Sequence, residues 1–281
     1  MNTKLILIEG LPGSGKTTIA KLVHELLKKQ GLDAQLFLEG NLDHPADYDS
    51  VAFFDKNEYR RLLEEYPEYQ KMLKNNVVMK GNGYFIPYVK IKEKYGEQIP
   101  HQLFNEICTR DIYELSFEKN TELITESWKD FGEKALHEDS PYVFECCFMQ
   151  NPLTIGLVKY NRSMEEVSGY VLGLAENIKS LNPLLIYVDQ NNLETSFKKA
   201  LDERPKAWSE GFIEYYTEQG YGESHKLYGV DGTIKVLEAM KLLEKEIYDN
   251  LDMKKIWLDN SQFNLGKTKE ILKDELEDIF K

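Results

Sequence analysis

Apolar residues along this chain form short continuous runs and longer stretches with helical spacing. The first continuous run, residues 5–8, is typical of a buried strand in a parallel sheet. Across residues 16–29 the apolar positions recur every three or four residues, which predicts an amphipathic helix, and Gly31 favours its end there. Residues 34–38 form the next apolar run. The opening therefore predicts a strand, a loop, a helix and a second strand, which make a βαβ unit.

The same alternation resumes after residue 120. Continuous apolar runs predict strands at 142–147, 184–188 and 256–258. Helical spacing predicts helices at 122–136, 165–178, 193–201, 206–217, 233–248 and 267–280. Strands that alternate with helices are typical of an α/β fold, in which a parallel sheet has helices on both faces.

Residues 55–120 follow a different pattern. Tyr, Glu and Lys are frequent there, and the apolar spacing is helical. The glycines of Gly81-Asn82-Gly83 interrupt this spacing before an aromatic run at 84–88. We interpret 55–120 as a helical insertion, the acceptor or lid region of a core formed by 1–54 and 121–281.

Composition narrows the class of ligand. The 281 residues carry a formal net charge of −13, which argues against nucleic-acid binding because Lys and Arg contacts supply most of that affinity. The charge favours a soluble protein with a small-molecule ligand. The first apolar run is too short for a signal peptide, and no stretch approaches a membrane span, so we expect a cytoplasmic protein without a membrane partner. The three cysteines form no CxxC pair and are expected to be buried thiols.

The strongest chemical signal is the loop from Gly10 to Thr17, which matches G-x-x-x-x-G-K-[ST] completely. Its glycines let successive N–H groups point at phosphate oxygens, and the following helix N-terminus also favours anions. Lys16 would reach the β- and γ-phosphates, and the Thr17 hydroxyl would ligate magnesium. The expected ligand is a nucleoside triphosphate with Mg²⁺. The residues expected to bind it are Gly10, Pro12, Gly13, Ser14, Gly15, Lys16, Thr17 and Thr18.

With these features, the first forty residues resemble the P-loop NTPase superfamily. The chain has neither the N-K-x-D nor the D-x-x-G motif of switch GTPases, which favours ATP over GTP. Its third strand of the core ends in Glu145, and the order of parts is similar to the nucleoside and nucleotide kinase-like branch. That resemblance implies that Glu145 helps hold Mg²⁺ and that the insertion binds the acceptor. It also implies that the charged segment 189–206 is a lid that donates Lys or Arg to the transferred phosphoryl group.

One departure from the branch concerns this cation. The branch often has an arginine directly after the third-strand acid, whereas this chain has Cys146. The cation must therefore come from elsewhere, and Arg204, with Lys198 and Lys199, occupies the lid position. Arg110 either faces the acceptor or forms a surface ion pair.

We assign the catalytic base to Glu39, the first polar residue after the strand at 34–38. Carboxyl ends of neighbouring parallel strands face one crevice, so Glu39 should face the cleft that holds Lys16 and Glu145. Alternatively, Glu39 caps the loop 41–43, and Asp43 and Asp47 are rivals for the base. The acceptor pocket is less defined, because aromatic residues fill cores as well as bind rings. Its candidate residues are Tyr84, Phe85, Tyr88, Trp128 and Gln150.

These features together indicate an ATP- and Mg²⁺-dependent small-molecule kinase with Lys16, Glu39 and Arg204 as catalytic residues. The alternative is a regulatory P-loop NTPase whose bound nucleotide controls a protein partner. Fold alone does not separate the two, but turnover does. A kinase needs its acceptor for rapid turnover, whereas a regulatory NTPase does not.

Overall fold

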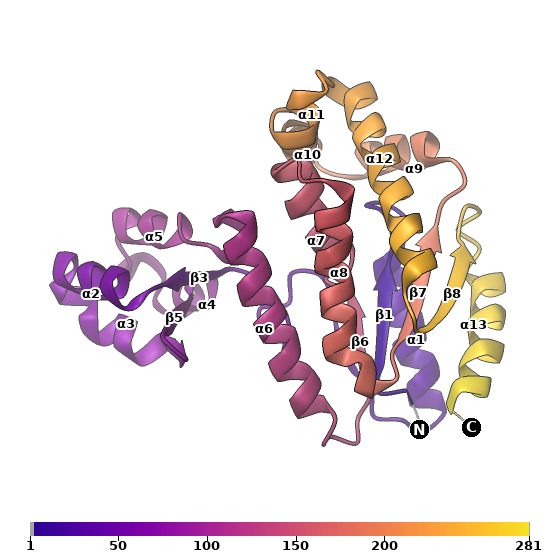
Figure 1. Ribbon diagram of the computed structural model, residues 1–281, viewed down its shortest axis with the longest axis horizontal. Coiled ribbons are helices and arrows are strands. Elements are labelled where there is room, and N and C mark those ends of the chain that lie inside the picture. Colours follow the sequence, from indigo (N-terminus) through magenta and orange to yellow (C-terminus); the bar gives the residue numbers. More distant parts are fainter. Residues whose placement is uncertain (1–2, 281) are drawn as a thin grey trace. The chain divides into compact units, whose positions relative to one another are not determined.

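The computed structural model describes residues 3–280 of the chain. By their contacts these residues form two compact units, one from residues 3–39 and 128–280 and the other from Gly40–Ser127. We call them the core unit and the inserted unit and describe each by itself (Figure 1). No helix within residues 3–280 is long and apolar enough to cross a membrane.

A five-stranded sheet with the order β2-β6-β1-β7-β8 forms the centre of the core unit, and every strand pair in it is parallel. Its strands are β1 (Leu5–Glu9), β2 (Gln35–Phe37), β6 (Tyr142–Glu145), β7 (Leu184–Asp189) and β8 (Lys254–Asp259). The register places Ile8 of β1 opposite Glu145 on one side and Ile186 on the other. The predicted parallel α/β fold is confirmed, with β6 inserted between the first two strands of the chain.

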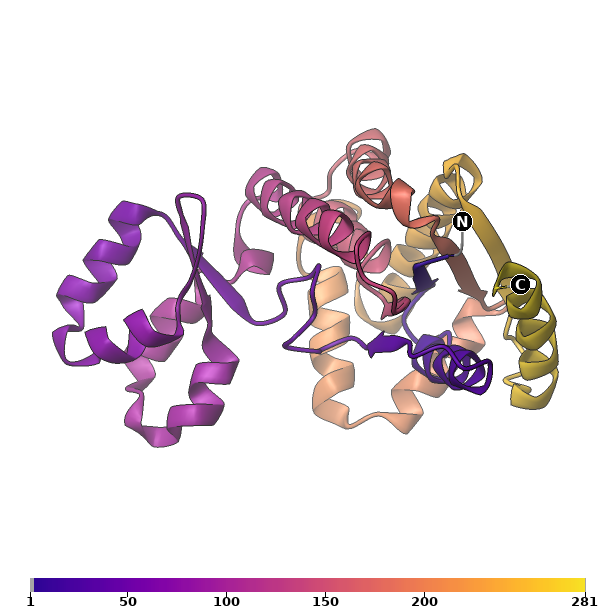
Figure 2. The ribbon, with the colours of Figure 1, turned by 90° about the horizontal axis from the view of Figure 1, so that it is seen from below.

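Helices cover both faces of this sheet, as Figure 2 shows in a view roughly along the strands. On one face, α1 (Lys16–Lys29) and α13 (Leu265–Phe280) bury Ile19, Val23 and Leu272 against Ile6 and Val143. Each such side chain contributes about 1.5–3 kcal/mol when fully buried. The other face carries α8 (Met164–Ile178), α12 (Gly229–Asn250) and the end of α6 (Phe117–Ala135).

The remaining helical segments of the core unit lie at the carboxyl ends of the strands or beside them. A π-helical segment, Thr154–Lys159, directly follows α7. The helix α8 begins with a capping box in which Ser163 and Glu166 bind each other's backbone N–H groups. The other helices are α7 (Gln150–Leu153), α9 (Leu193–Glu203), α10 (Lys206–Thr217) and α11 (Gly220–Ser224).

The inserted unit contains helices and also a three-stranded antiparallel sheet with the order β3-β5-β4. Our prediction of a wholly helical insertion was therefore incomplete. The aromatic run that we did not assign is β5, which pairs through Phe85 with Phe53 and Val78. The strands are β3 (Val51–Phe54), β4 (Val78–Lys80) and β5 (Gly83–Pro87). The helices are α2 (Lys56–Glu65), α3 (Gln70–Asn76), α4 (Tyr88–Tyr95) and α5 (His101–Cys108).

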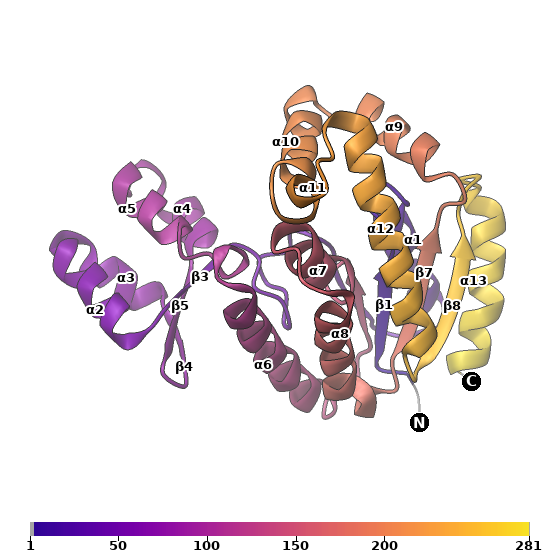
Figure 3. The ribbon, with the colours of Figure 1, turned by 45° about the horizontal axis from the view of Figure 1, so that its top comes forward.

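Local sequence explains this small sheet. Gly81 and Asn82 form a two-residue loop between β4 and β5 (Figure 3), and Gly81 has a φ of 54°, which glycine adopts without strain. A Cβ atom at Gly83 would lie 2.6 Å from the Phe53 ring, so close packing of β3 on β5 also requires glycine there. The aromatic and β-branched residues on either side are those that strands favour.

Candidate functional site

The loop between β1 and α1 has a backbone that requires its glycines. Gly10, Gly13 and Gly15 have φ values of 141°, 84° and 94°, which other residues rarely adopt. A Cβ atom on Gly10 would lie 2.4 Å from the Val188 carbonyl oxygen, and one on Gly15 would lie 2.7 Å from Asn260 Nδ2. The loop therefore packs tightly against β7 and the segment after β8.

Lys16 and Thr17 begin α1, directly after this loop. The Lys16 side chain is buried, and its Nζ donates to the Leu11 carbonyl oxygen at 3.1 Å and to Gln150 Oε1 at 2.7 Å. The Thr17 hydroxyl donates to Glu145 Oε1 at 2.7 Å. The helix thus presents a cation and a hydroxyl side by side at the carboxyl edge of the sheet.

Glu145 and Glu39 lie at the same carboxyl edge of the sheet, at the end of β6 and after β2. Glu145 ends β6 and is 2% exposed, and its Oε2 accepts the backbone N–H of Glu39 at 3.4 Å. The Glu39 side chain is exposed and lines the same cavity as Glu145. The loop after Glu39 is capped instead by Asn41, whose Oδ1 accepts the Asp43 N–H at 2.9 Å. The structure therefore brings together Lys16, Thr17, Glu145 and Glu39.

The two rivals for the base lie in the inserted unit and have partners there. Asp43 pairs with Lys90, and Asp47 accepts from the Tyr113 hydroxyl. His44, between them, accepts the Asp47 N–H at Nδ1 at 2.9 Å, and burial lowers its pKa to about 3. A neutral His44 thus braces this loop. Within residues 3–280 no three His, Cys, Asp or Glu residues form a metal-binding group.

A cavity of about 820 Å³ within the core unit is lined by Lys16, Thr17, Glu39 and Glu145 on one side and by the predicted lid on the other. The lid cations Lys199 and Arg204 line it, whereas Lys198 pairs with Glu194. Arg204 lies over the Trp208 ring at 4.7 Å, and Lys199 lies over the Phe263 ring at 3.9 Å. The other lining residues are Pro12, Gly13, Gly15, Thr18, Gln150, Asn151, Thr154, Ser196, Ala200, Glu203, Ala207, Gly211, Phe212, Tyr215 and Tyr216.

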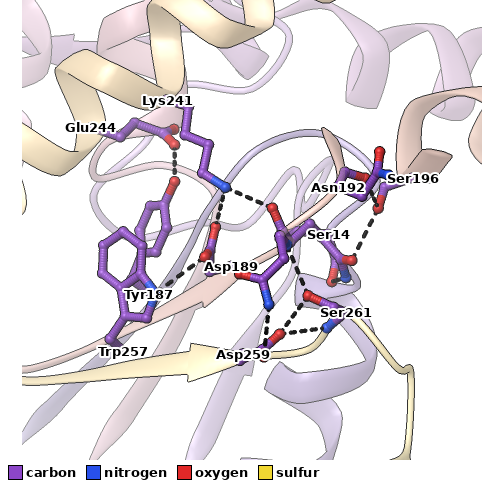
Figure 4. Close-up of polar contacts among 12 residues, drawn as sticks. Ser14, Tyr187, Asp189, Asn192, Ser196, Lys241, Glu244, Trp257, Asp259 and Ser261 are labelled. Carbon is purple, nitrogen blue, oxygen red and sulfur yellow. Dashed lines mark hydrogen bonds and ion pairs between the residues drawn. The ribbon is translucent and has the colours of Figure 1, made fainter. Parts of the chain in front are cut away.

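The far side of the loop is held by a hydrogen-bond network that sequence reasoning missed (Figure 4). The Ser14 carbonyl oxygen accepts from Gln190 Nε2 at 3.1 Å and from Asn260 Nδ2 at 2.8 Å. Ser196 of α9 donates to Gln190 Oε1 at 3.0 Å. Lys241 donates to the Gln190 carbonyl oxygen and pairs with Asp189, both at 2.6 Å. This network connects the loop to α9, α12 and the segment after β8.

The Ser14 hydroxyl is buried and has no hydrogen-bond partner among residues 3–280.

Glu9 is a second feature that the sequence did not reveal. It ends β1, is 0% exposed, and accepts the Phe148 N–H at 2.8 Å and the Gln150 N–H at 3.0 Å. Burial raises its pKa to about 7, although the backbone hydrogen bonds and the charge of Lys16 lower it in part. Glu9 holds the turn after β6, in which Cys146 has a φ of 77°. Its only sequence signal was a charged residue at the end of an apolar run.

The predicted acceptor-pocket residues are scattered. Trp128 is fully buried in the core unit, where its ring packs against Phe144, so it fills the core. In the inserted unit Tyr84 stacks on Tyr59, while Tyr88 donates to Asp111. These three aromatic residues are explained by packing and hydrogen bonding within their own units.

Arg110 forms an ion pair, which is one of its two predicted alternatives, while a contact with an acceptor stays a prediction. Its Nη2 pairs with Glu58 Oε1 at 2.5 Å, as in a surface ion pair. Arg110 and Phe85 also line a cavity of about 540 Å³ that lies wholly within the inserted unit. The inserted unit thus has its own polar hollow, and Arg110 is oriented at its wall by Glu58.

Comparisons with known proteins place these observations in context. No family model matches the chain, and no curated protein matches it. Among solved structures, thymidylate kinase from Candida albicans matches with a TM-score of 0.40 and 12% identity, over 99% of this chain and 91% of that chain. The chain is thus similar to that enzyme over nearly its whole length, at low identity, while its assignment to the parallel α/β class rests on the order of its own five strands.

Proposed function

We propose that this protein is an ATP- and Mg²⁺-dependent phosphotransferase that acts on a small-molecule acceptor. One observation carries the proposal: a single cavity is lined by the glycine loop, Lys16, the Thr17–Glu145 pair, Glu39 and two lid cations. Phosphoryl transfer needs little covalent chemistry from a protein, because positioning and charge neutralisation supply most of the catalysis. This set of groups supplies both.

The residues present fit a magnesium nucleotide. The glycine conformations leave the loop backbone open at positions where a Cβ atom would clash, and the loop ends at a helix N-terminus, which favours anions. The Thr17 hydroxyl and the Glu145 carboxylate are hard oxygen ligands, which Mg²⁺ prefers. They would hold the ion, which when bound neutralises phosphate charge.

Three side chains have proposed roles of their own. Lys16 would bind the phosphates. Glu39, whose carboxylate is exposed at the cavity wall, would accept the proton of an acceptor hydroxyl. Arg204, which lies over the Trp208 ring, would neutralise the transferred phosphoryl group, with Lys199 as the second cation.

The test is turnover of Mg·ATP with and without acceptors. ADP formation is measured for the wild type alone and with nucleosides, nucleotides, sugars and amino sugars. We expect slow hydrolysis alone and strong stimulation by one class of acceptor. Turnover that no acceptor stimulates would instead favour a regulatory NTPase.

A pair of lysine variants tests whether this loop binds the nucleotide. Lys16→Ala should fold and lose ATP binding, measured with a fluorescent ATP analogue, because it removes the cation beside the loop. Lys28→Ala, an exposed lysine of the same helix, is the matched control and should bind as the wild type does. Equal ATP affinity in all three proteins would exclude this loop as the nucleotide site.

A further inference from the structure

Gln150 is held in place through both its backbone and its side chain. It is the first residue of α7, and its N–H is fixed by the fully buried Glu9. Residues 146–149 are Cys, Cys, Phe and Met, so Gln150 is the first side chain after Glu145 that can donate a strong hydrogen bond. It is 7% exposed and lines the cavity of the glycine loop.

The orientation of the Gln150 carboxamide follows from its partner. The Lys16 ammonium group has only donors, so the atom that faces it at 2.7 Å must be the acceptor, Oε1. The Nε2 group therefore points away from Lys16. Within the described residues Nε2 has no protein partner, and it is not among the atoms sealed from solvent. An amide donor without a protein partner among the described residues thus lies beside the lysine that we assign to phosphate binding.

We propose that Gln150 recognises the terminal phosphate of the bound triphosphate by donating from Nε2 to one of its oxygens. This inference rests on the proposed function, since it requires phosphates beside Lys16. A donor paired with an anionic oxygen forms a hydrogen bond about twice as strong as a neutral pair. Lys16 holds Oε1 and Glu9 holds the backbone, so the amide meets the phosphate already oriented. A diphosphate, which lacks that group, would not receive this bond.

The experiment compares the affinities of fluorescent ATP and ADP analogues in Mg²⁺ for the wild type and three variants. Gln150→Met keeps the side-chain length and removes the donor. Gln150→Glu keeps an acceptor for Lys16 and places a negative charge beside the phosphate. Gln98→Met, an exposed glutamine of the inserted unit, is the control. Thermal melting of each protein checks that it is folded.

We expect the preference for ATP over ADP to fall about tenfold in Gln150→Met, which is the loss of one charge-assisted hydrogen bond. Gln150→Glu should reduce it further, and Gln98→Met should keep it. A fall in both affinities by the same factor, or an unchanged preference in both Gln150 variants, would mean that Gln150 only shapes the turn. If the wild type bound neither nucleotide, the proposed function would fail with the inference, whereas wild-type binding with an unchanged preference overturns the inference alone.

Discussion

The Thr17 hydroxyl donates to Glu145 Oε1 at 2.7 Å and so joins the start of α1 to the end of β6, 128 positions apart in the sequence. The contact exists because β6 lies directly beside β1 in the sheet. A hydroxyl and a carboxylate at this distance are close enough to share one hard cation. The pair is therefore the place at which to test the proposed magnesium site.

Replacement of Glu145 by glutamine should raise the Mg²⁺ concentration needed for half-maximal turnover by about tenfold or more, because one anionic ligand becomes neutral. The hydrogen bond from Thr17 can persist, since glutamine keeps an acceptor oxygen. A Mg²⁺ titration of turnover measures the change. Glu138→Gln, which alters a carboxylate at the opposite end of β6, is the control, and an unchanged Mg²⁺ dependence in Glu145→Gln would reject the ligand role.

Glu39→Gln should keep the binding of ATP and of the acceptor while kcat falls by ~10²–10⁴, the usual contribution of a general base. Asp43→Asn serves as the comparison. Asp43 is paired with Lys90 in the inserted unit, so this substitution should have little effect on kcat. Single-turnover kinetics with the identified acceptor measure the step. A Glu39→Gln protein with a kcat near that of the wild type would remove Glu39 from the mechanism.

Arg204→Ala should lower kcat by about tenfold or more with little change in ATP affinity, because charge on the transferred group grows toward the transition state. Lys198→Ala is the matched lid variant, since Lys198 pairs with Glu194 rather than lining the cavity, and it should behave as the wild type. Steady-state kinetics separate the two effects. A change confined to KM for ATP would assign Arg204 to nucleotide binding instead.

Glu244 gives a prediction about stability. It is 0% exposed, accepts from the Tyr187 hydroxyl, and burial raises its pKa to about 7 from 4.5. A carboxyl group with a raised pKa favours folding in its protonated form. Its contribution is complete below about pH 4.5 and is lost as the pH rises through about 7.

Glu244→Gln cannot ionise, so its stability relative to the wild type should increase between pH 5 and pH 8. The increase is at most about 3 kcal/mol, since each unit of pKa shift corresponds to about 1.4 kcal/mol. Urea unfolding at several pH values measures it. Glu246→Gln, an exposed carboxylate of the same helix, should show no such trend. A constant difference between Glu244→Gln and the wild type at all pH values would contradict the assignment.

The sequence by itself determined the strands and the long helices of the core unit and the phosphate loop, but not the short segments α7, Thr154–Lys159 and α11. Residues 5–8 and 16–29 were predicted as strand and helix, and the structure has Leu5–Glu9 and Lys16–Lys29. These features depend on local patterns, namely unbroken apolar runs, helical spacing and the glycine motif, which each segment carries independently of its neighbours. The hairpin of β4 and β5 also had a local signal in Gly81-Asn82, which we interpreted only as a break.

Only the tertiary structure decided which of these segments are neighbours. The position of β6 between β2 and β1 brings Glu145 to Thr17 and Glu39, and no local pattern specifies that order. The partnerships of Glu9 with the Gln150 N–H and of Lys16 with the Gln150 side chain likewise join residues more than 130 positions apart. A buried carboxylate or lysine is tolerated only where the fold supplies hydrogen-bond partners, so the burial of Glu9 and Lys16 could not be predicted before those partners were known.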